Sequence, residues 1–76
     1  MTRQVLDARR LLCPLPVIRT QQAVEQLKPG DTLEVCATDP GALLDIPTWC
    51  RLNGHDVISA TTDGPDVRIT LLVKEA

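Results

Sequence analysis

Aromatic residues are almost absent from this chain of 76 residues, which contains no Phe or Tyr and a single Trp at position 49. The core of the protein must therefore consist of aliphatic side chains. Proteins that bind single-stranded nucleic acids stack bases on aromatic side chains, and this sequence lacks them. The formal net charge of −2 also offers no basic field for a phosphate backbone. We therefore expect no direct nucleic-acid partner.

Long hydrophobic runs are missing as well. No apolar segment approaches the length of about 20 residues that a helix needs to cross a bilayer. Residues 1–4, Met-Thr-Arg-Gln, lead directly into a strand pattern and do not resemble a signal peptide. We therefore expect a cytoplasmic protein without membrane association.

The chain has three cysteines, and their spacing does not suggest disulfide pairs. Cys13, Cys36 and Cys50 make an odd number, which favours free thiols in a reducing compartment over a disulfide framework. There is no Cys-x-x-Cys, and the nearest pair of metal-binding residue types is Cys50 and His55, on either side of a predicted helix end. The spacing rules for a metal site are not met, so we expect neither a metal nor a cofactor.

Cys13 stands directly before a segment with helical spacing. Pro14 suits the first position of a helix, which makes Cys13 the predicted N-cap. A sulfur there lies at the positive end of the helix dipole, which favours the thiolate. Pro16 removes a second amide, so only the N–H groups of Leu15 and Val17 are expected to face the sulfur. The local pattern leaves two interpretations open: a reactive thiol with a stiff, apolar rim, or a buried structural cysteine.

Six elements are expected along the chain. They are a strand at 4–8, a helix at 14–27, a strand at 32–38, a second helix, and two strands at 55–62 and 67–74. The second helix is predicted in two parts, a short turn after Asp39-Pro40-Gly41 and a main helix from Asp45 to Asn53, because Asp followed by Pro marks a helix start twice.

Periodicity predicts which side chains face inward. The first helix carries small or apolar residues at helical intervals at Val17, Thr20, Ala23, Val24 and Leu27. In the strand at 32–38, alternation places Leu33, Val35 and Ala37 on the covered face and Cys36 on the other. The stripe of the second helix consists of Ile46, Trp49, Cys50 and Asn53, and Gly54 is predicted to end that helix.

The order of these elements predicts the fold. The last two strands are separated by Asp63-Gly64-Pro65-Asp66, which suits an antiparallel hairpin. Short β-α-β units have parallel strands and right-handed crossovers, so both helices should cover one face of the sheet. We therefore predict an α/β fold: one domain over residues 1–76, a two-layer sandwich of order β-α-β-α-β-β with a mixed four-stranded sheet.

Several short motifs occur together in this sequence. They are Leu6-Asp7, Leu12-Cys13-Pro14-Leu15-Pro16-Val17, Lys28-Pro29-Gly30, Leu33-Glu34-Val35, Asp39-Pro40, Asp45-Ile46-Pro47-x-Trp49 and Gly54-His55. This set resembles the TusA/SirA family of small sulfur-carrier proteins over nearly the whole chain. Arg10 departs from the pattern, because many relatives have glycine at that position.

The resemblance implies a function. The cysteine of the family's Cys-Pro-x-Pro motif corresponds to Cys13, which would accept sulfane sulfur as a persulfide, supported by Pro14, Leu15, Pro16 and Val17. A cysteine desulfurase or a rhodanese-type protein would donate the sulfur, and a downstream relay protein would accept it. The resemblance implies that the sulfur serves 2-thiolation of transfer RNA or dissimilatory sulfur metabolism. Members of the family also affect the supply of molybdenum cofactor and of iron–sulfur clusters. We expect a monomeric sulfurtransferase-type relay rather than a complete turnover enzyme.

Other interpretations remain beside this one. Cys13 would also serve a redox or regulatory module that forms mixed disulfides, and a nucleic-acid binder is the second alternative. His55, at the start of the third strand, is a candidate general base, or else a cap or surface histidine. Arg9, Arg10 and Arg19 flank Cys13, where they would attract a thiolate or an acidic partner surface.

Overall fold

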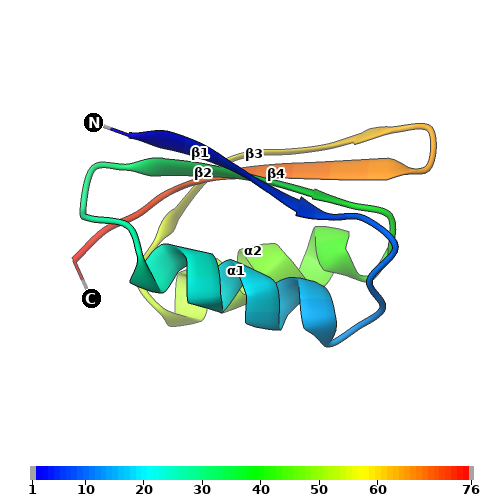
Figure 1. The fold of residues 1–76 in the computed structure, drawn as a ribbon, viewed down its shortest axis with the longest axis horizontal. Helices are drawn as coiled ribbons and strands as arrows, with labels where there is room; N and C mark the ends of the chain where they lie inside the picture. Colours follow the sequence, from blue (N-terminus) through cyan, green and yellow to red (C-terminus); the bar gives the residue numbers. More distant parts are fainter. Residues whose placement is uncertain (1, 76) are drawn as a thin grey trace.

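A computed structural model describes residues 2–75 and has the predicted order of elements (Figure 1). They are β1 (Arg3–Ala8), α1 (Leu15–Glu25), β2 (Thr32–Ala37), α2 (Ala42–Leu52), β3 (Asp56–Asp63) and β4 (Asp66–Leu72). The strand boundaries differ from the predicted ones by one or two residues. Neither helix is long and apolar enough to span a membrane.

The four strands form one mixed sheet in the order β1-β2-β4-β3. β1 and β2 are parallel, while β4 runs antiparallel to both β2 and β3. Figure 1 shows α1 and α2 side by side against the same face of this sheet, with both helices beginning at the same end of the molecule. The predicted two-layer arrangement is confirmed.

The core lies between the sheet and the two helices, and it is aliphatic as the composition requires. Every second residue of β2 is fully buried, namely Leu33, Val35 and Ala37. Ile69 and Leu71 of β4 join them from the neighbouring strand, with relative exposures of 0%. The inward-facing residues predicted for α1 are buried or pack against this cluster.

The first helix begins one residue later than predicted. Pro14 is its N-cap, so Cys13 lies outside the helix, in the loop that precedes it. Pro16 is buried in the first turn, and its carbonyl oxygen accepts a hydrogen bond from Thr20 Oγ1 at 2.8 Å. The Pro16 ring therefore faces the core.

The second helix is continuous, and the predicted division at Asp45 is wrong. Its first turn is closed by i−3 hydrogen bonds, including Leu44 N–H to the Gly41 carbonyl at 3.1 Å, and Gly41 is the N-cap. The Asp45 amide also donates to the Gly41 carbonyl, at 2.9 Å, so the turn leads directly into the helix. Pro47 removes one backbone donor inside α2 but does not divide it.

α2 ends in a Schellman motif, and Gly54 follows its last turn as predicted. Gly54 has φ +79°, in the left-handed region where glycine is favoured. The His55 amide donates to the Cys50 carbonyl at 2.8 Å, and the Gly54 amide donates to the Arg51 carbonyl at 3.4 Å. Asn53, which we placed on the inward stripe, is exposed because it is the C-cap and its amide side chain folds back onto the Trp49 carbonyl.

Candidate functional site

Cys13 lies in the loop between β1 and α1, at the end of the molecule where both helices begin (Figure 1). Among the three cysteines of the chain, which are all free thiols, it is the exposed one. The parallel β1-α1-β2-α2 connections bring the start of α2 beside this loop, because each helix begins after the carboxyl end of a parallel strand.

Two carboxylates hold Cys13. Its backbone N–H donates to Asp39 Oδ2 at 2.9 Å, and its thiol donates to Asp45 Oδ2 at 3.3 Å. Asp39 Oδ1 accepts a second hydrogen bond from the Gly41 amide, at 3.1 Å. Asp39 thus ties the loop before α1 to the loop before α2, while Asp45 places a charge directly against the sulfur.

This environment favours the thiol over the thiolate. The hydrogen bond to the Asp45 carboxylate raises the pKa of Cys13 above its usual value, and partial desolvation and the charge of Asp39 add to this effect. The predicted stabilisation of the thiolate by the helix start is therefore wrong. The Leu15 amide, which we expected to face the sulfur, donates instead to the Leu12 carbonyl at 2.9 Å.

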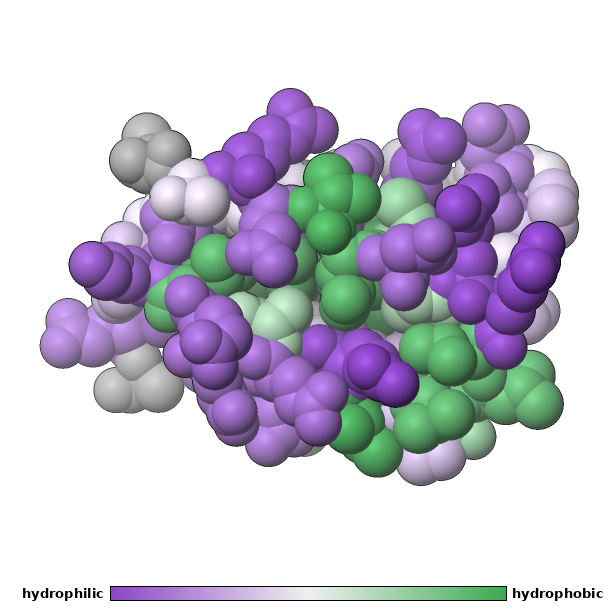
Figure 2. Space-filling view, in the orientation of Figure 1, coloured by the Kyte–Doolittle hydropathy of each residue, from purple (hydrophilic) through white to green (hydrophobic). Residues whose placement is uncertain are grey.

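Exposed apolar side chains adjoin Cys13 and Asp45 in the chain. Leu12, Leu15 and Ile18 are 73%, 42% and 41% exposed, and Leu44, beside Asp45 in the first turn of α2, is 68% exposed. In Figure 2 hydrophobic residues gather at the lower right, over the ends where the two helices begin. A group of exposed large apolar side chains is typical of a surface that binds another protein, a membrane or a ligand.

The residues predicted to support Cys13 separate into two kinds. Pro14 and Leu15 are exposed beside the thiol. Pro16 is buried and Val17 is half-buried against the core, so these two anchor the first turn of α1 from below.

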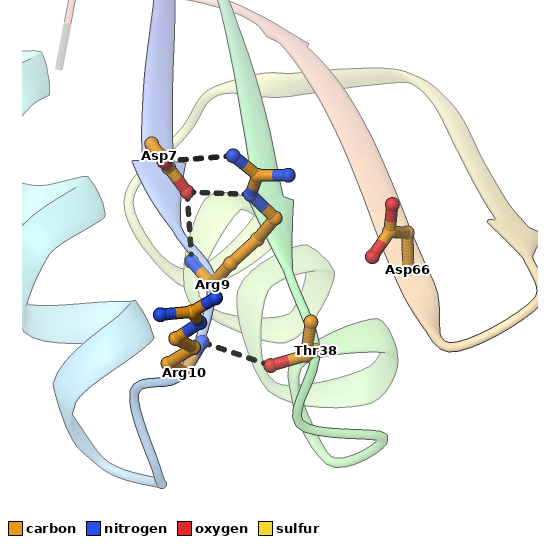
Figure 3. Close-up of a pocket in the computed structure, with 5 residues that line it drawn as sticks. All are labelled: Asp7, Arg9, Arg10, Thr38 and Asp66. Carbon is orange, nitrogen blue, oxygen red and sulfur yellow. Dashed lines mark hydrogen bonds and ion pairs between the residues drawn. The ribbon is translucent and has the colours of Figure 1, made fainter.

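The hydrogen bonds of Arg9 and Arg10 go to Asp7 and Thr38, not to the sulfur of Cys13. Arg9 is bound by Asp7 through Nε–Oδ1 and Nη2–Oδ2 hydrogen bonds of 2.9 and 3.1 Å, which help lower the pKa of Asp7 to about 2. This ion pair forms part of the wall of a surface pocket of about 460 Å³, which is lined by Asp7, Arg9, Arg10, Thr38 and Asp66 (Figure 3). The Arg10 amide donates to Thr38 Oγ1 at 2.9 Å, so this region fixes the loop that carries Cys13.

The other two cysteines have different surroundings. Cys36 lies on the uncovered face of the sheet, in register with Asp7 on one side and Arg68 on the other. Cys50 is fully buried in the core, and this burial raises the pKa of its thiol to about 11. The predicted places of both are confirmed, and neither thiol is as open to a partner as Cys13.

His55 lies at the opposite end of α2 from Asp45. A helix of 11 residues separates the two ends by about 16 Å. The ring is 8% exposed, its Nδ1 accepts a hydrogen bond from the Lys74 amide at 3.0 Å, and it stacks on Trp49 at 5.5 Å between ring centroids. These contacts show that His55 is a buried structural residue, so the surface position that we considered as the alternative to a general base is wrong. Within residues 2–75, no three His, Cys, Asp or Glu side chains are grouped as a metal site requires.

Sequence reasoning missed the parts that Asp39 and Asp45 play at the site. Both were interpreted as helix-start residues, from the pattern Asp-Pro at 39–40 and Asp-Ile-Pro at 45–47. Their positions in the chain could have indicated these roles. Asp39 follows the second strand and Asp45 lies in the first turn of the next helix, and both are at the end of the sheet where the Cys13 loop also lies.

Comparison with known proteins shows the family and the fold of this chain. The family model described as sulfurtransferase TusA matches residues 4–73. The chain is 46% identical over 61 residues to YrkI of Bacillus subtilis, named as a candidate sulfur carrier protein, in a match covering 80% of this chain and 81% of YrkI. A relative of the same description from Neisseria meningitidis is 40% identical over 74 residues, 97% of each chain. The crystal structure of a SirA-like protein from Desulfitobacterium hafniense shares the fold, with a TM-score of 0.82, 22% identity and coverage of 95% of this chain and 99% of that one.

Proposed function

The chain belongs to the TusA family, and from that premise we propose that it is a sulfur carrier that holds sulfane sulfur as a persulfide on Cys13. The observation that carries this proposal is the position of Cys13. Cys13 is exposed and has exposed apolar residues on both sides of it in the chain, whereas Cys36 is partly covered and Cys50 is buried. A carrier needs a thiol that a partner's sulfur can reach, and little else.

Sulfur acceptance is a thiol exchange. The Cys13 thiolate attacks the outer sulfur of a donor persulfide, a new S–S bond forms, and the bond between the donor's two sulfurs breaks. The donor cysteine leaves as a thiolate and takes up a proton. No net oxidation occurs, so the carrier needs no cofactor for this step.

Onward transfer is the same reaction in the other direction. An acceptor thiolate attacks the outer sulfur of the Cys13 persulfide, and Cys13 leaves as a thiolate that regains its proton. The proposed donor is a cysteine desulfurase or a rhodanese-type protein, and the acceptor is a downstream relay protein. Pro14 and Leu15 would meet these partners at the surface, while Pro16 and Val17 hold the turn beneath them.

The setting we propose is a reducing cytoplasm, in which Cys13 stays a free thiol between transfers. The carrier would work as a monomer that docks each partner in turn. Transfer RNA 2-thiolation and dissimilatory sulfur metabolism are the two pathways that such a relay would supply.

The test is sulfur loading. The protein is incubated with a cysteine desulfurase and cysteine, and its intact mass is measured under non-reducing conditions. We expect an increase of one sulfur atom on the wild type, located at Cys13 by peptide mapping. Cys13→Ser should abolish the increase.

Cys36→Ser and Cys50→Ala are the matched controls, because each removes a thiol that is less accessible. Both should load like the wild type. Loading that persists in Cys13→Ser and maps to Cys36 or Cys50 would contradict the proposal. Disulfide adducts in place of added sulfur would favour the redox module instead.

A further inference from the structure

The contact between the Cys13 thiol and Asp45 is unusual for a cysteine that must act as a nucleophile, because a carboxylate opposes ionisation of the sulfur. We propose that Asp45 keeps the outer sulfur of the Cys13 persulfide protonated, and so holds the loaded protein in the form that gives its sulfur away. This inference rests on the proposed function and adds a residue to it.

The geometry places the outer sulfur within reach of Asp45. Asp45 Oδ2 lies 3.3 Å from the sulfur of Cys13. An S–S bond is about 2.05 Å long, so an outer sulfur attached to Cys13 cannot lie farther than about 5.4 Å from Oδ2 in this arrangement. Orientations of the S–S bond that bring the outer sulfur to hydrogen-bond distance let an S–S–H group donate to the carboxylate, and anywhere within this range the carboxylate repels an S–S⁻ group.

The charges around the sulfur act in the same direction. Asp45, in the first turn of α2, accepts a hydrogen bond from the thiol, and Asp39, in the loop between β2 and α2, accepts one from the backbone N–H of Cys13. On the β1 side, Arg9 is bound by Asp7, and its electrostatic effect falls on Asp7, Asp66 and Cys36. The two charged groups that raise the pKa of the Cys13 thiol are Asp45 and Asp39.

Asp39 and Asp45 differ in how they are used. Both oxygens of Asp39 accept hydrogen bonds from backbone N–H groups, those of Cys13 and Gly41. The main role of this carboxylate is therefore to hold the two loops together. Asp45 Oδ2 faces the thiol itself. Removing the charge of Asp45 therefore tests the sulfur chemistry with less disturbance of the loops.

The protonation state decides what a persulfide does. A neutral S–S–H group is attacked at its outer sulfur by an incoming thiolate, with Cys13 as the leaving group. An ionised S–S⁻ group is itself a nucleophile and repels an anionic acceptor. A carboxylate beside the persulfide therefore favours onward transfer, at the cost of a smaller thiolate fraction during acceptance.

The experiment compares wild type with Asp45→Asn, which keeps the shape of the side chain and removes its charge. Both proteins are loaded and then treated with cyanide, a small acceptor that needs no docking surface. Cyanide attacks the outer sulfur and leaves as thiocyanate, while Cys13 is released as a thiolate. We expect equal rates at acidic pH, where both persulfides are protonated, and a rate about tenfold lower for Asp45→Asn near neutral pH, corresponding to a shift of about one pKa unit.

Glu25→Gln is the matched control, because it removes one exposed carboxylate at the last residue of α1, the end of that helix away from Cys13, and should follow the wild-type profile. A second measurement needs no loading and no variant: the pH dependence of Cys13 alkylation should give the wild-type thiol a pKa above that of an ordinary cysteine. Equal cyanolysis profiles for wild type and Asp45→Asn, or an ordinary or lowered wild-type thiol pKa, would overturn the inference. Failure of the wild type to load would overturn the proposed function, and the alkylation measurement would still decide on the contact.

Discussion

The two ends of the helical layer are built differently. At the end where the helices begin, Cys13 is exposed among apolar side chains, and it is held by hydrogen bonds to Asp39 and Asp45. At the end where α2 finishes, a Schellman motif leads into His55, which is buried against Trp49. At the first end Leu12 and Leu44 are exposed beside the loop of Cys13 and the first turn of α2, whereas at the second end His55 is buried, although Leu52 there is 81% exposed.

In this small domain, one end of the helical layer carries the candidate functional residue and the other end contributes to stability. A chain of this length has few residues to spare for the core, so its stability depends on the elements that pack well. The end beside His55 supplies such packing. The end beside Cys13 is free to present a thiol, because the fold does not depend on covering it.

The largest expected effect is on the covered end. Trp49 is half-buried, packs against the core and stacks on His55, so Trp49→Ala should lower the free energy of unfolding by about 2–3 kcal/mol. A fully buried ring would cost more. Urea unfolding followed by far-UV circular dichroism measures the loss.

Leu44→Ala is the control for this prediction, since it removes an apolar side chain at the other end of the same helix. Leu44 is 68% exposed, so the loss should stay below about 0.5 kcal/mol. Sulfur transfer to a protein acceptor should nevertheless slow in this variant. Equal losses of stability for Trp49→Ala and Leu44→Ala would remove the distinction between the two ends.

The next effect concerns Pro16, which joins the two regions. Pro16→Ala should slow onward transfer, because the first turn of α1 becomes less rigid. Because the ring is buried, we expect a loss of about 1–2 kcal/mol as well, from lost packing and a more flexible unfolded chain. Thermal unfolding and a two-step assay of loading and transfer measure both effects.

Leu15→Ala provides the comparison for Pro16, because it alters the same helical turn at an exposed position. It should cost less stability than Pro16→Ala and slow transfer to a protein acceptor at least as much. If Pro16→Ala unfolds outright, its role is structural alone, and an unchanged melting temperature would show that the ring contributes little to the core.

The sequence predicted the fold more fully than the site. Alternation in β2 and the helical interval in α1 report burial directly, because each depends on neighbours a few residues away. The contacts of Cys13 join it to residues 26 and 32 positions along the chain, and no local period carries that information. The thiolate prediction failed for this reason: it considered the dipole of the nearest helix and not the carboxylates that the sheet brings beside it.

The third effect is a pH dependence on the β1 side of the site. Arg9 helps hold the pKa of Asp7 at about 2, below its usual value near 4. The folded-state value is lowered, so the stabilisation is present above the usual value and is lost as the pH falls from about 4 to about 2. Carboxyl NMR titration should show this low value in the wild type and a value closer to the ordinary one in Arg9→Gln. An unchanged value in Arg9→Gln would show that Arg9 does not hold the charge of Asp7.

The smallest expected effect is at Arg10, the residue that departs from the family pattern. Arg10 has φ +68°, in the left-handed region that costs a residue with a side chain about 1–2 kcal/mol. Glycine adopts this conformation freely but loses about 0.5–1 kcal/mol more through chain entropy. Arg10→Gly should therefore raise the free energy of unfolding by about 0–1 kcal/mol. Its amide still donates to Thr38 Oγ1, so the loop that carries Cys13 keeps its place and sulfur loading should not change.

Arg9→Gly is the matched control: it puts glycine in the same loop but removes the ion pair with Asp7, and it should destabilise the protein. A loss of stability in Arg10→Gly as large as that in Arg9→Gly would show that the Arg10 side chain, and not its backbone conformation, matters to this end of the molecule.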